Sequence, residues 1–600
     1  MISLPNLINP LKLSLFLSIF LMVNIVIGQT TEILILDWQK EKRLHQGDQS
    51  ILVPHIKNQN MDGNRPNFFW RKELRGNSNY STSFVLESTE PATAVEIAYL
   101  SSQGITVNQL TYDFGISKAN EKRHATLNLF PFVRQNNQIV RIKSIKLKVG
   151  KGEMENYLAT KDFVANSVLQ NGSGVWYKIR VDKDGIYKID KTFLEECGID
   201  LVGLNPQHIH IYGNGDGKLP ELNSDPRTDD LAQNAIQIIG EGDGSFDDDD
   251  YILFYGWGAH RWSLDLSNSR FDQQRNPYSD FSYYFININS NVTPSRIVDT
   301  PSTTSTVNNT VNSYSYYTVH EIDATSLVGG GQRWYGDLFD TQLQRTFTFN
   351  IPNIETATPA DFSVSLASNS QSAGGTSQSY SVGGLSLFSS PLPSGAGAGN
   401  YRRNLNGAVD FSMSSPPNII QLSMTVTRNS PDVLTYLDRI LLNARRSLTM
   451  MDDQFNFTDL NSAGPGNVSM FSISGATNQT FVWDVTDRHN PRNILGALSG
   501  TNFEYSIETD DVTSWATASG MSFFTPTRIG AVDYQNLHGL AQVDYLIVTN
   551  KGFLNQANRL AGLHRANGTS VHVVTTEQIY NEFSSGAIDA TAIKSFAKMF

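Results

Sequence analysis

The sequence predicts a multidomain protein that is mostly β, made of β-rich modules and a β-sandwich, followed by the start of an α/β domain. Charged residues make up 17% of the chain and aromatic residues 10%, a profile typical of exported β-rich modules. The last sixty residues, 541–600, differ because short apolar runs there alternate with helical spacing. With 600 residues, the chain has room for several domains.

Residues 1–28 have the pattern of a secretory signal peptide. Lys12 precedes an apolar core from Leu13 to Ile27, and the small residue Gly28 follows it. This core of about 15 residues is shorter than the roughly 20 that a membrane-spanning helix needs. We therefore expect an exported protein, with an uncleaved membrane anchor as the alternative.

Residues 29–150 predict an N-terminal β domain. Toward the end of the stretch 139–149, apolar and polar residues alternate, as in an antiparallel strand with one dry face. Ile142 and Lys143 fall out of this alternation, which indicates a β-bulge. The more polar residues 151–171 predict a connector.

Residues 172–299 predict a compact β module that is rich in turns and aromatic residues. Val175–Val181 has the pattern of a strand, and Ile186–Ile189 has that of a second strand. Asp184-Gly185 stands between them and is typical of a hairpin turn. We therefore expect the two strands to pair with each other.

Cys197 is the only cysteine in the sequence, so an intramolecular disulfide is excluded. It stands at the end of a short helix predicted at 191–197, which Gly198 would cap in the left-handed conformation. The neighbouring Glu195 and Glu196 disfavour the thiolate that a nucleophile needs. We interpret Cys197 as a structural thiol and not a catalytic one.

Two patterns in this module are candidates for metal binding. His208, His210 and Tyr212 share one face of a predicted strand, but no third ligand is near, which favours ordinary exposed or hydrogen-bonded histidines. The acidic segment Asp243–Asp250 aligns with the later part of a calcium loop, although Ile239 would occupy its first position. Calcium binding is therefore open beside an acidic turn between two strands. No other cofactor or metal is predicted.

Residues 300–309 are rich in Ser, Thr and Asn and predict a linker. Residues 310–530 predict a β-sandwich with long loops, because strand patterns recur there with polar stretches between them. The largest of these stretches, 368–399, is dominated by Ser and Gly. The pattern of Tyr436–Leu448 fits a helix as well as a strand.

The stretch 541–600 predicts a βαβ unit. The apolar run Val543–Thr549 is typical of a strand that is buried on both faces. A helical pattern follows and ends at Asn567-Gly568, and Val571–Val574 predicts a second strand. Two strands joined by a helix in this way must be parallel.

Two further helices are predicted, at 577–583 and from Asp589 onward. The second has an apolar stripe, with no strand after it to cover the stripe: Ile593, Phe596, Ala597 and Phe600. Because two parallel strands cannot complete a buried sheet, we expect this domain to be incomplete and the 600 residues to be the front of a longer protein.

Composition and motifs exclude several classes of function. The formal net charge of −12 argues against a nucleic-acid partner, whose phosphates require clustered Lys and Arg. The sequence contains no Gly-x-Ser-x-Gly elbow, His-Glu-x-x-His pair, Cys-x-x-Cys pair or complete nucleotide-binding loop. Spacing alone therefore identifies no active site.

Several phrases in the chain resemble a known family. The most specific are Val175-Trp-Tyr-Lys-Ile179, Ile211-Tyr-Gly-Asn-Gly215, Leu219-Pro-Glu221, Gly240-Glu-Gly-Asp-Gly-Ser-Phe-Asp247 and Tyr251-Ile-Leu-Phe-Tyr-Gly256. Ile579-Tyr-Asn-Glu-Phe-Ser584, with Gly586 and Asp589, resembles the opening of the gingipain catalytic domain. The chain is similar to the sortases of the type IX secretion system of Bacteroidetes, which are gingipain-like cysteine peptidases.

This resemblance implies a caspase-like α/β domain with a Cys–His dyad, in a protein at the cell surface that is associated with the outer membrane. Members remove C-terminal sorting domains from secreted cargo and attach the cargo to anionic lipopolysaccharide. They work beside an outer-membrane β-barrel shuttle and other attachment-complex subunits. Neither Cys197 nor His538, His564 or His572 matches the family's dyad, which is expected downstream of Phe600. No catalytic residue is assigned within this chain.

Two other functions remain open on the sequence. A secreted, broad-substrate gingipain-like protease would share the α/β domain. A non-catalytic β-rich adhesin or assembly scaffold would account for the β modules alone.

Overall fold

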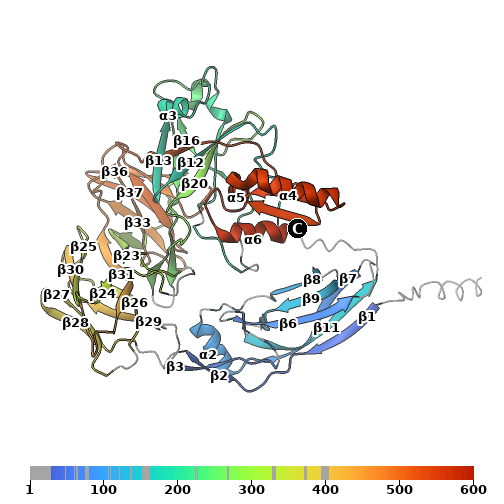
Figure 1. Cartoon of the computed structure of the whole chain (residues 1–600). Coiled ribbons are helices and arrows are strands. Elements are labelled where there is room, and N and C mark those ends of the chain that lie inside the picture. The colour runs from blue at the N-terminus through green and yellow to red at the C-terminus, as the bar shows by residue number, and fades with distance from the viewer. Residues whose placement is uncertain are drawn as a thin grey trace, which may run out of the picture. The chain divides into compact units, whose positions relative to one another are not determined.

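The computed structural model describes the chain from residue 29 to residue 600, in two compact units, 1–161 and 162–600 (Figure 1). The predicted signal peptide, 1–28, lies outside the described residues. Within the described range, the positions left out are 47–48, 58, 60, 63–64, 75–79, 104, 106, 108–109, 120–121, 136–137, 152–162, 216, 223–224, 226, 266–268, 328–330, 332, 371–373 and 394–404. Most of the predicted connector, 151–171, therefore also lies outside the description.

The first unit is a β domain with one described helix, α2, Ala94–Ser102. Thr93 and Glu96 form a capping box at its start, a signal that the sequence analysis did not use. The strands of this unit are β1 Gln29–Ile35, β2 Lys42–Gln46, β3 Gln49–Val53, β4 Met61–Asp62, β5 Arg65–Pro66, β6 Phe68–Leu74, β7 Tyr80–Pro91, β8 Tyr112–Ala119, β9 Lys122–Leu129, β10 Phe132–Gln135 and β11 Gln138–Lys151.

Two antiparallel sheets enclose the core of the first unit. One has the order β1-β11-β10, with β7 also paired to β11, and the other has the order β6-β9-β8. Leu127 of β9 and Ile145 of β11 belong to the same buried apolar cluster. The predicted β-bulge is confirmed, because the register between β11 and β7 shifts between Ile142 and Ser144, where Lys143 has no partner, and again between Ser144 and Ile145.

The second unit begins with a two-sheet β module. Its first sheet has the order β15-β14-β20-β12-β39, and its second the order β13-β17-β16. The strands are β12 Val175–Val181, β13 Gly185–Asp190, β14 Ile209–Tyr212, β15 Gln233–Asn234, β16 Gln237–Ile239, β17 Tyr251–Gly256, β18 Arg261–Asp265, β19 Arg270–Gln274, β20 Ser282–Ile288 and, far along the chain, β39 Thr527–Ala531. Helix α3, Lys191–Glu196, and short 3-10 helices at Pro206–His208 and Glu241–Asp243 connect them.

The hairpin predicted around Asp184-Gly185 is wrong. β12 pairs with β20 and β39, whereas β13 pairs with β17. The two strands lie in different sheets, and Ile179 of β12 and Ile189 of β13 pack into one core between those sheets. The turn therefore carries the chain from one layer to the other, since pairing each strand with a distant partner buries both apolar faces.

The region predicted as one β-sandwich, 310–530, is two sandwiches. The first packs a sheet of order β23-β31-β26-β29, with β24 at β31, on a sheet of order β25-β30-β27-β28. Its strands are β23 Ser313–Glu321, β24 Leu338–Phe339, β25 Gln344–Asn350, β26 Ala360–Ser368, β27 Ser377–Val382, β28 Leu385–Ser390, β29 Leu405–Met413, β30 Ile419–Thr427 and β31 Thr435–Ser447. The ambiguous stretch at 436–448 is thus a strand, and the expected loop at 368–399 contains the hairpin β27–β28.

The second sandwich has a sheet of order β21-β35-β34-β38-β32 and another of order β22-β33-β37-β36. Its strands are β21 Val298–Pro301, β22 Asn309–Val311, β32 Gln454–Thr458, β33 Val468–Ile473, β34 Phe481–Asp484, β35 Arg492–Leu495, β36 Ala497–Ser499, β37 Asn502–Glu508 and β38 Ser514–Ala518. The predicted linker 300–309 is corrected by this fold. Its first and last residues lie in β21 and β22, which pair in parallel with β35 and β33.

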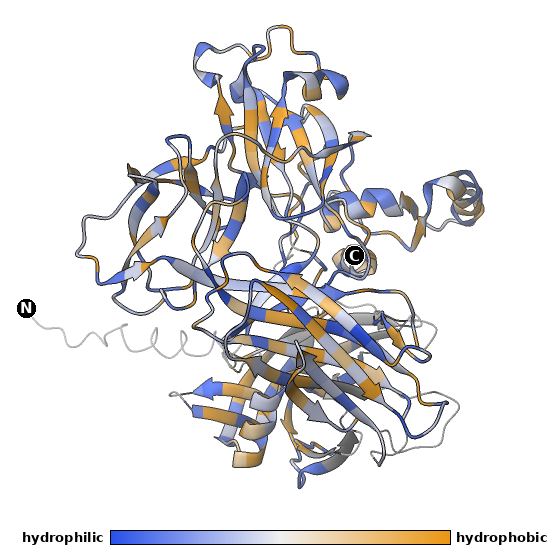
Figure 2. Cartoon of the chain, turned by 90° about the vertical axis from the view of Figure 1, so that its left-hand side faces the viewer, coloured by the Kyte–Doolittle hydropathy of each residue, from blue (hydrophilic) through white to orange (hydrophobic). Residues whose placement is uncertain are grey.

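The chain ends in an α/β segment with β40 Tyr545–Thr549, a 3-10 helix at Lys551–Phe553, α4 Leu554–Ala566, β41 Val571–Thr575, α5 Thr576–Phe583 and α6 Ala590–Met599. β40 and β41 are parallel, so the predicted βαβ unit is confirmed. Gly568 has a φ of +83° at the end of α4, as predicted, and Asp589 caps α6. Figure 2 shows hydrophobic and hydrophilic residues interspersed along many of the strands.

Burial in the α/β segment differs from the prediction in two places. β40 is not buried on both faces: Tyr545 is exposed and the next four residues are half-buried, because among the described strands only β41 pairs with it. The stripe on α6 is partly covered, since Phe596 is fully buried against Phe583 of α5 and Leu219 of the β module. None of the helices in the described part of the chain combines the length and apolar character needed to cross a membrane.

Candidate functional site

The C-terminal segment, defined as residues 532–600, packs against the outer face of the five-stranded sheet of the β module. This face carries the residues that alternate with the core positions, among them Trp176 and Lys178 of β12 and Phe285 of β20. The structure brings α5 to this face, as Figure 1 shows beside β12 and β20. The contact joins stretches that are more than 300 residues apart in sequence.

Lys178 is a buried lysine that joins the two parts. Its Nζ donates hydrogen bonds to the carbonyl oxygen of Gly586 at 2.7 Å and to Oδ1 of Asn581 at 3.1 Å. The ammonium group also lies over the ring of Tyr283, 4.5 Å from its centroid. Burial lowers the pKa of Lys178 to about 8, with Glu577 opposing the shift. A buried amine of this kind tolerates few other arrangements, so it fixes the position of the turn after α5.

The loop between β14 and β15 makes a second contact with the segment. The backbone N–H of Asn214 donates to Oγ of Ser585 at 3.0 Å, and that of Leu219 donates to Oδ2 of Asp589 at 2.9 Å. This loop thus receives the turn that precedes α6. Two of the sequence phrases that carry the family resemblance lie at this contact.

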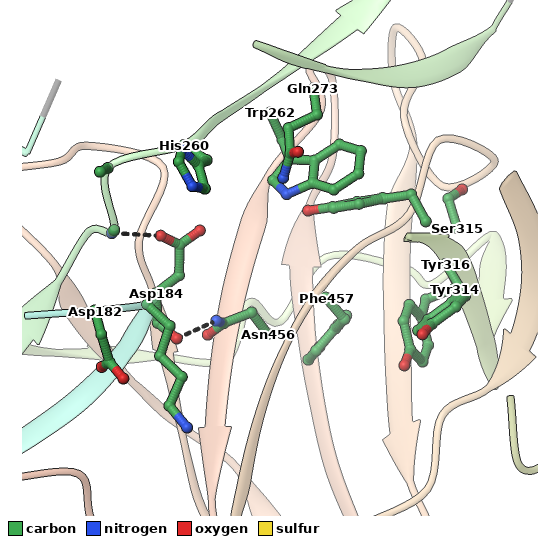
Figure 3. Close-up of a pocket in the computed structure, with 14 residues that line it drawn as sticks. Asp182, Asp184, His260, Trp262, Gln273, Tyr314, Ser315, Tyr316, Asn456 and Phe457 are labelled. Carbon is green, nitrogen blue, oxygen red and sulfur yellow. Dashed lines mark hydrogen bonds between the residues drawn. The ribbon is translucent and has the colours of Figure 1, made fainter. Parts of the chain in front are cut away.

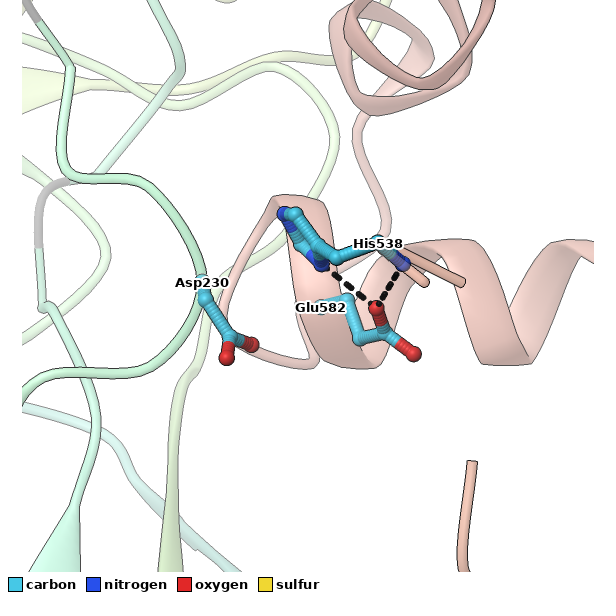
Figure 4. A group of neighbouring side chains, drawn as sticks. All are labelled: Asp230, His538 and Glu582. Carbon is cyan, nitrogen blue, oxygen red and sulfur yellow. Dashed lines mark hydrogen bonds and ion pairs between the residues drawn. The ribbon is translucent and has the colours of Figure 1, made fainter. Parts of the chain in front are cut away.

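A buried histidine, His538, lies at the centre of the contact and bonds to Glu582, with Asp230 nearby (Figure 4). His538 Nδ1 lies 2.6 Å from Oε2 of Glu582, and Nε2 lies 3.0 Å from Oδ1 of Asp229. The side chains of His538 and Glu582 are both 0% exposed. The ring of His538 also stacks on Phe583, with the centroids 4.5 Å apart. Both ring nitrogens face carboxylate oxygens, an arrangement that favours the doubly protonated imidazolium.

The carboxylates of this cluster have further partners. Glu582 accepts the backbone N–H groups of Leu537 and His538 and the side-chain amide of Gln535. Asp230, the neighbour of Asp229 in the chain, also lies near His538. Its carboxylate accepts hydrogen bonds from the Ser167 hydroxyl and the Val168 N–H. Burial raises the pKa of Asp230 to about 6, against the effect of these hydrogen bonds. The segment and the β module are therefore joined by a connected polar network.

The cluster also has the composition of a metal site, because Asp230, His538 and Glu582 place ligand atoms within 4.8 Å of one another. Three histidine and carboxylate ligands would suit a divalent cation such as zinc. The observed hydrogen bonds fit a proton better. Both nitrogens of His538 already face carboxylate oxygens, and the oxygens of Glu582 accept backbone N–H groups.

Comparisons with known proteins identify the segment. The family model "Peptidase family C25" matches residues 538–600. The crystal structure of dimeric latent PorU from Porphyromonas gingivalis matches with a TM-score of 0.64 and 26% sequence identity, over 73% of this chain and 40% of that one. The chain is PorU-like. Its mostly β architecture with the start of a C25 domain at the C-terminus agrees with the predicted fold class.

Other comparisons add nothing to this likeness. The mosquito-larvicidal Cry4Aa toxin from Bacillus thuringiensis matches with 11% identity and a TM-score of only 0.16, over 63% of this chain and 58% of the toxin. No curated protein sequence matches the chain. This chain spans about 40% of the length of the PorU structure.

The C25 match begins at His538, so the histidine between the carboxylates is the first residue of the matched region. The structure places His564 on α4, stacked on Tyr545, and His572 on β41, with Nε2 3.0 Å from the carbonyl of Ala541. No cysteine accompanies any of these three histidines. Cys197 stands at the end of α3, half-buried against the core of the β module, and burial raises its thiol pKa to about 11. Such a thiol is a poor nucleophile at neutral pH.

The first candidate metal site of the β module, the histidine pair, is not assembled as predicted. His208 ends a 3-10 helix and is not part of β14, so the predicted face holds only His210 and Tyr212. His210 is buried, with Nε2 3.0 Å from the carbonyl of Asn289 and Nδ1 3.1 Å from the amide of Gln233. Both ring nitrogens are therefore already used within the protein.

The acidic loop connects β16 and β17, which are antiparallel. Asp250 accepts the N–H of Asp247 at 2.7 Å, and Asp243 accepts that of Ser245 at 3.0 Å. Phe246 is buried in the core of the module. The loop thus has the contacts of a turn between strands. The three aspartates still bring ligand oxygens within 4.8 Å, and calcium binding stays a prediction.

Sequence reasoning did not single out the residues of the polar network. Asp229 and Asp230 follow one recognised phrase, Glu582 lies inside another, and His538 was considered only as a catalytic candidate. Lys178 stands within the first phrase of the β module. The shared signal was available: four ionisable residues lie in or beside phrases that carry the resemblance.

We expect the contact to weaken at alkaline pH. Burial alone would lower the pKa of His538, but the hydrogen bonds to Asp229 and Glu582 outweigh it and raise the pKa to about 9. The unfolded value is about 6.5. Because the folded pKa lies above the unfolded one, this stabilisation is complete below about pH 6.5 and is lost as the pH rises through about 9.

Hydrogen exchange of α5 measured at pH 7 and pH 10, corrected for intrinsic rates, would check this. Protection should fall at the higher pH in the wild type and change much less in His538→Gln. An equal pH response in both proteins would mean that other groups control the contact.

Proposed function

We propose that this chain is the front part of a cell-surface cysteine endopeptidase and transpeptidase of the type IX secretion system. In this proposal the complete protein removes C-terminal sorting domains from secreted cargo and joins the cargo to anionic lipopolysaccharide. The observation that supports it most is the combination of a C25 match at the C-terminus with a PorU-like arrangement of the modules before it.

We place the Cys–His dyad of this enzyme in sequence that follows Phe600. Two observations support this. The chain spans 40% of the PorU structure, and β40 exposes Tyr545, while α4 exposes Leu560 and Leu563, surfaces that further strands and helices of a C25 domain would cover. The proposed surroundings are the outer membrane, with a β-barrel shuttle and other attachment-complex subunits as partners.

The β module has a definite part in this proposal. Its sheet binds the opening of the C25 domain through Lys178, the β14–β15 loop and the buried His538 network. A catalytic domain that includes α5 and α6 would therefore be held in a fixed position against the β module. We expect the front part to orient the catalytic domain toward cargo, and not to take part in bond cleavage.

Residues 1–600 alone should show no peptidase activity. The reason is that the single thiol, Cys197, is half-buried with a raised pKa and is not paired with a histidine among the described residues. The measurement is cleavage of a cargo protein with a C-terminal sorting domain, comparing this chain with the product of the extended reading frame. Activity of the extended protein should be blocked by thiol alkylation.

The same assay separates the proposal from its alternatives. Cleavage of unrelated unfolded proteins at similar rates would indicate a broad-substrate protease. An extended protein with no thiol-dependent activity would indicate a scaffold. Thiol-dependent cleavage by residues 1–600 would show that the dyad lies within this chain.

A further inference from the structure

A cavity of about 330 Å³ lies between the β module and the two sandwiches, away from the C25 segment (Figure 3). Its wall comes from the turn after β12, from the stretch 258–262, from β19, from β23 and from β32. This volume is at the lower end of the range for ligand sites and fits one side chain with its flanking backbone. Figure 3 shows Asp182, Asp184 and His260 on one side and Trp262 and the β23 residues on the other.

The first side of the cavity carries the carboxylates of Asp182 and Asp184. Asp184 accepts the N–H of Gly258 at 2.6 Å, and Asp182 accepts the hydroxyl of Tyr187 at 2.9 Å. Among the described residues, neither carboxylate is in an ion pair with a lysine or arginine. Lys183, between them in sequence, turns its Nζ onto the ring of Phe524, 3.8 Å from the centroid.

Asp184 is therefore a carboxylate in a place that disfavours its charge. Burial raises its pKa to about 6, opposed by the Gly258 N–H and by the more distant charge of Arg488. Arg488 is engaged elsewhere, over the ring of Trp257 and with the carbonyl of Gly215. His260 adds no positive charge at neutral pH, because its Nδ1 accepts the N–H of Asn276 and burial lowers its pKa. Lys183 also lines the cavity, but its Nζ lies over Phe524, so a cationic ligand would supply the charge partner that the carboxylates do not have in the wall.

The second side is aromatic. Trp262 and Tyr317 have ring centroids 4.4 Å apart, and Tyr314 and Tyr316 from the same strand also line the cavity. Burial raises the pKa of Tyr317, and the nearby negative charge of Asp184 raises it further. The phenol and the carboxylate therefore line the same cavity at short range. The faces of such rings attract cations.

We propose that this cavity binds an arginine side chain of a peptide or protein partner, with the guanidinium between the carboxylates and the aromatic wall. The geometry favours arginine over lysine, because a planar guanidinium can stack on Trp262 while donating hydrogen bonds to Asp184. Asn456 holds the backbone of Asp184 in position, since its side-chain amide donates a hydrogen bond to the Asp184 carbonyl at 3.1 Å. This site lies outside the C25 segment and does not depend on peptidase activity.

Calorimetric titration of the whole chain with acetyl-Gly-Arg-Gly-amide tests the proposal. The matched peptide replaces arginine by citrulline, which has the same shape and no charge. We expect the arginine peptide to bind at least tenfold more tightly than the citrulline peptide. Asp184→Asn should lose this preference, while Asp248→Asn, in an exposed loop, should keep it.

Trp262→Ala provides a second variant, since its half-exposed side chain can be shortened even if Asp184→Asn does not fold. It should weaken arginine binding without changing the unfolding midpoint by more than the Asp248→Asn control. Equal binding of both peptides would overturn the proposal and favour a neutral, hydrogen-bonding ligand such as a saccharide. So would arginine binding that survives both Asp184→Asn and Trp262→Ala, or no binding up to millimolar peptide.

Discussion

Glu582→Ala should release α5 and α6 from the β module. The substitution removes the acceptor of His538 Nδ1–H and of several N–H groups, all in a buried place. It leaves a charged imidazolium with Asp229 as its only direct carboxylate partner. Breaking a buried charge pair in this way costs about 3–5 kcal/mol of unfolding free energy. Denaturant unfolding, with hydrogen exchange of 576–600, measures the loss.

Glu577→Ala is the matched control, because Glu577 lies one turn earlier on the same helix and is exposed. It should change the unfolding free energy by no more than about 1 kcal/mol, since it removes only a charge in the first turn of α5 and its through-space effect on Lys178. Faster exchange in α5 and α6 is expected only in Glu582→Ala. Similar losses in both variants would show that helix propensity, and not the buried network, holds the segment.

Gly586→Ala should be the second most damaging change at the contact. Gly586 has a φ of +81°, and a Cβ there would lie 2.6 Å from Cε and 2.7 Å from Nζ of Lys178. Lys178 cannot move aside without giving up its hydrogen bonds to Gly586 and Asn581. We expect a loss of about 2–4 kcal/mol, from the left-handed conformation and the broken bonds together.

Gly568→Ala separates these two contributions. Gly568 has nearly the same φ, +83°, but a Cβ there meets no atom within 4 Å. It should therefore cost only the conformational part, about 1–2 kcal/mol. Equal losses for the two alanine variants would mean that the close approach to Lys178 contributes nothing, and the role of that lysine would need revision.

The parts of the fold that follow from short-range patterns were predicted well. The βαβ unit, the left-handed end of α4 at Gly568 and the bulge at Ile142 each leave a pattern within one continuous stretch of sequence. The hairpin at Asp184-Gly185 failed for the opposite reason. Its turn signal is real, but the partners of β12 and β13 lie far along the chain, and no local pattern reports them.

The division of 310–530 into two sandwiches could not be predicted from strand patterns either. β21 and β22 precede the first sandwich in sequence but pair with β35 and β33 of the second. A strand placed this way has the same alternation as one that pairs with its neighbour. Only the long-range pairing shows that 300–309 is part of a folded domain.

The candidate site was hidden from the sequence for a related reason. Lys178, Asp229, His538 and Glu582 carry ordinary side chains in unremarkable spacing, and their meaning comes from contacts across several hundred residues. The family resemblance marked the right phrases, because these phrases surround the contact. It could not show that a histidine without a nearby cysteine serves to join two modules.

The position of β39 in the first sheet of the β module has a consequence for how the protein is made. β39 pairs with β12 at Tyr177–Arg180, yet both sandwiches are encoded between β20 and β39. During translation, β12 therefore presents an open edge until Thr527–Ala531 has left the ribosome, and open edges recruit foreign strands. The sandwiches act as an insertion in an interrupted domain, and replacing them by a short loop should let that domain close early in synthesis.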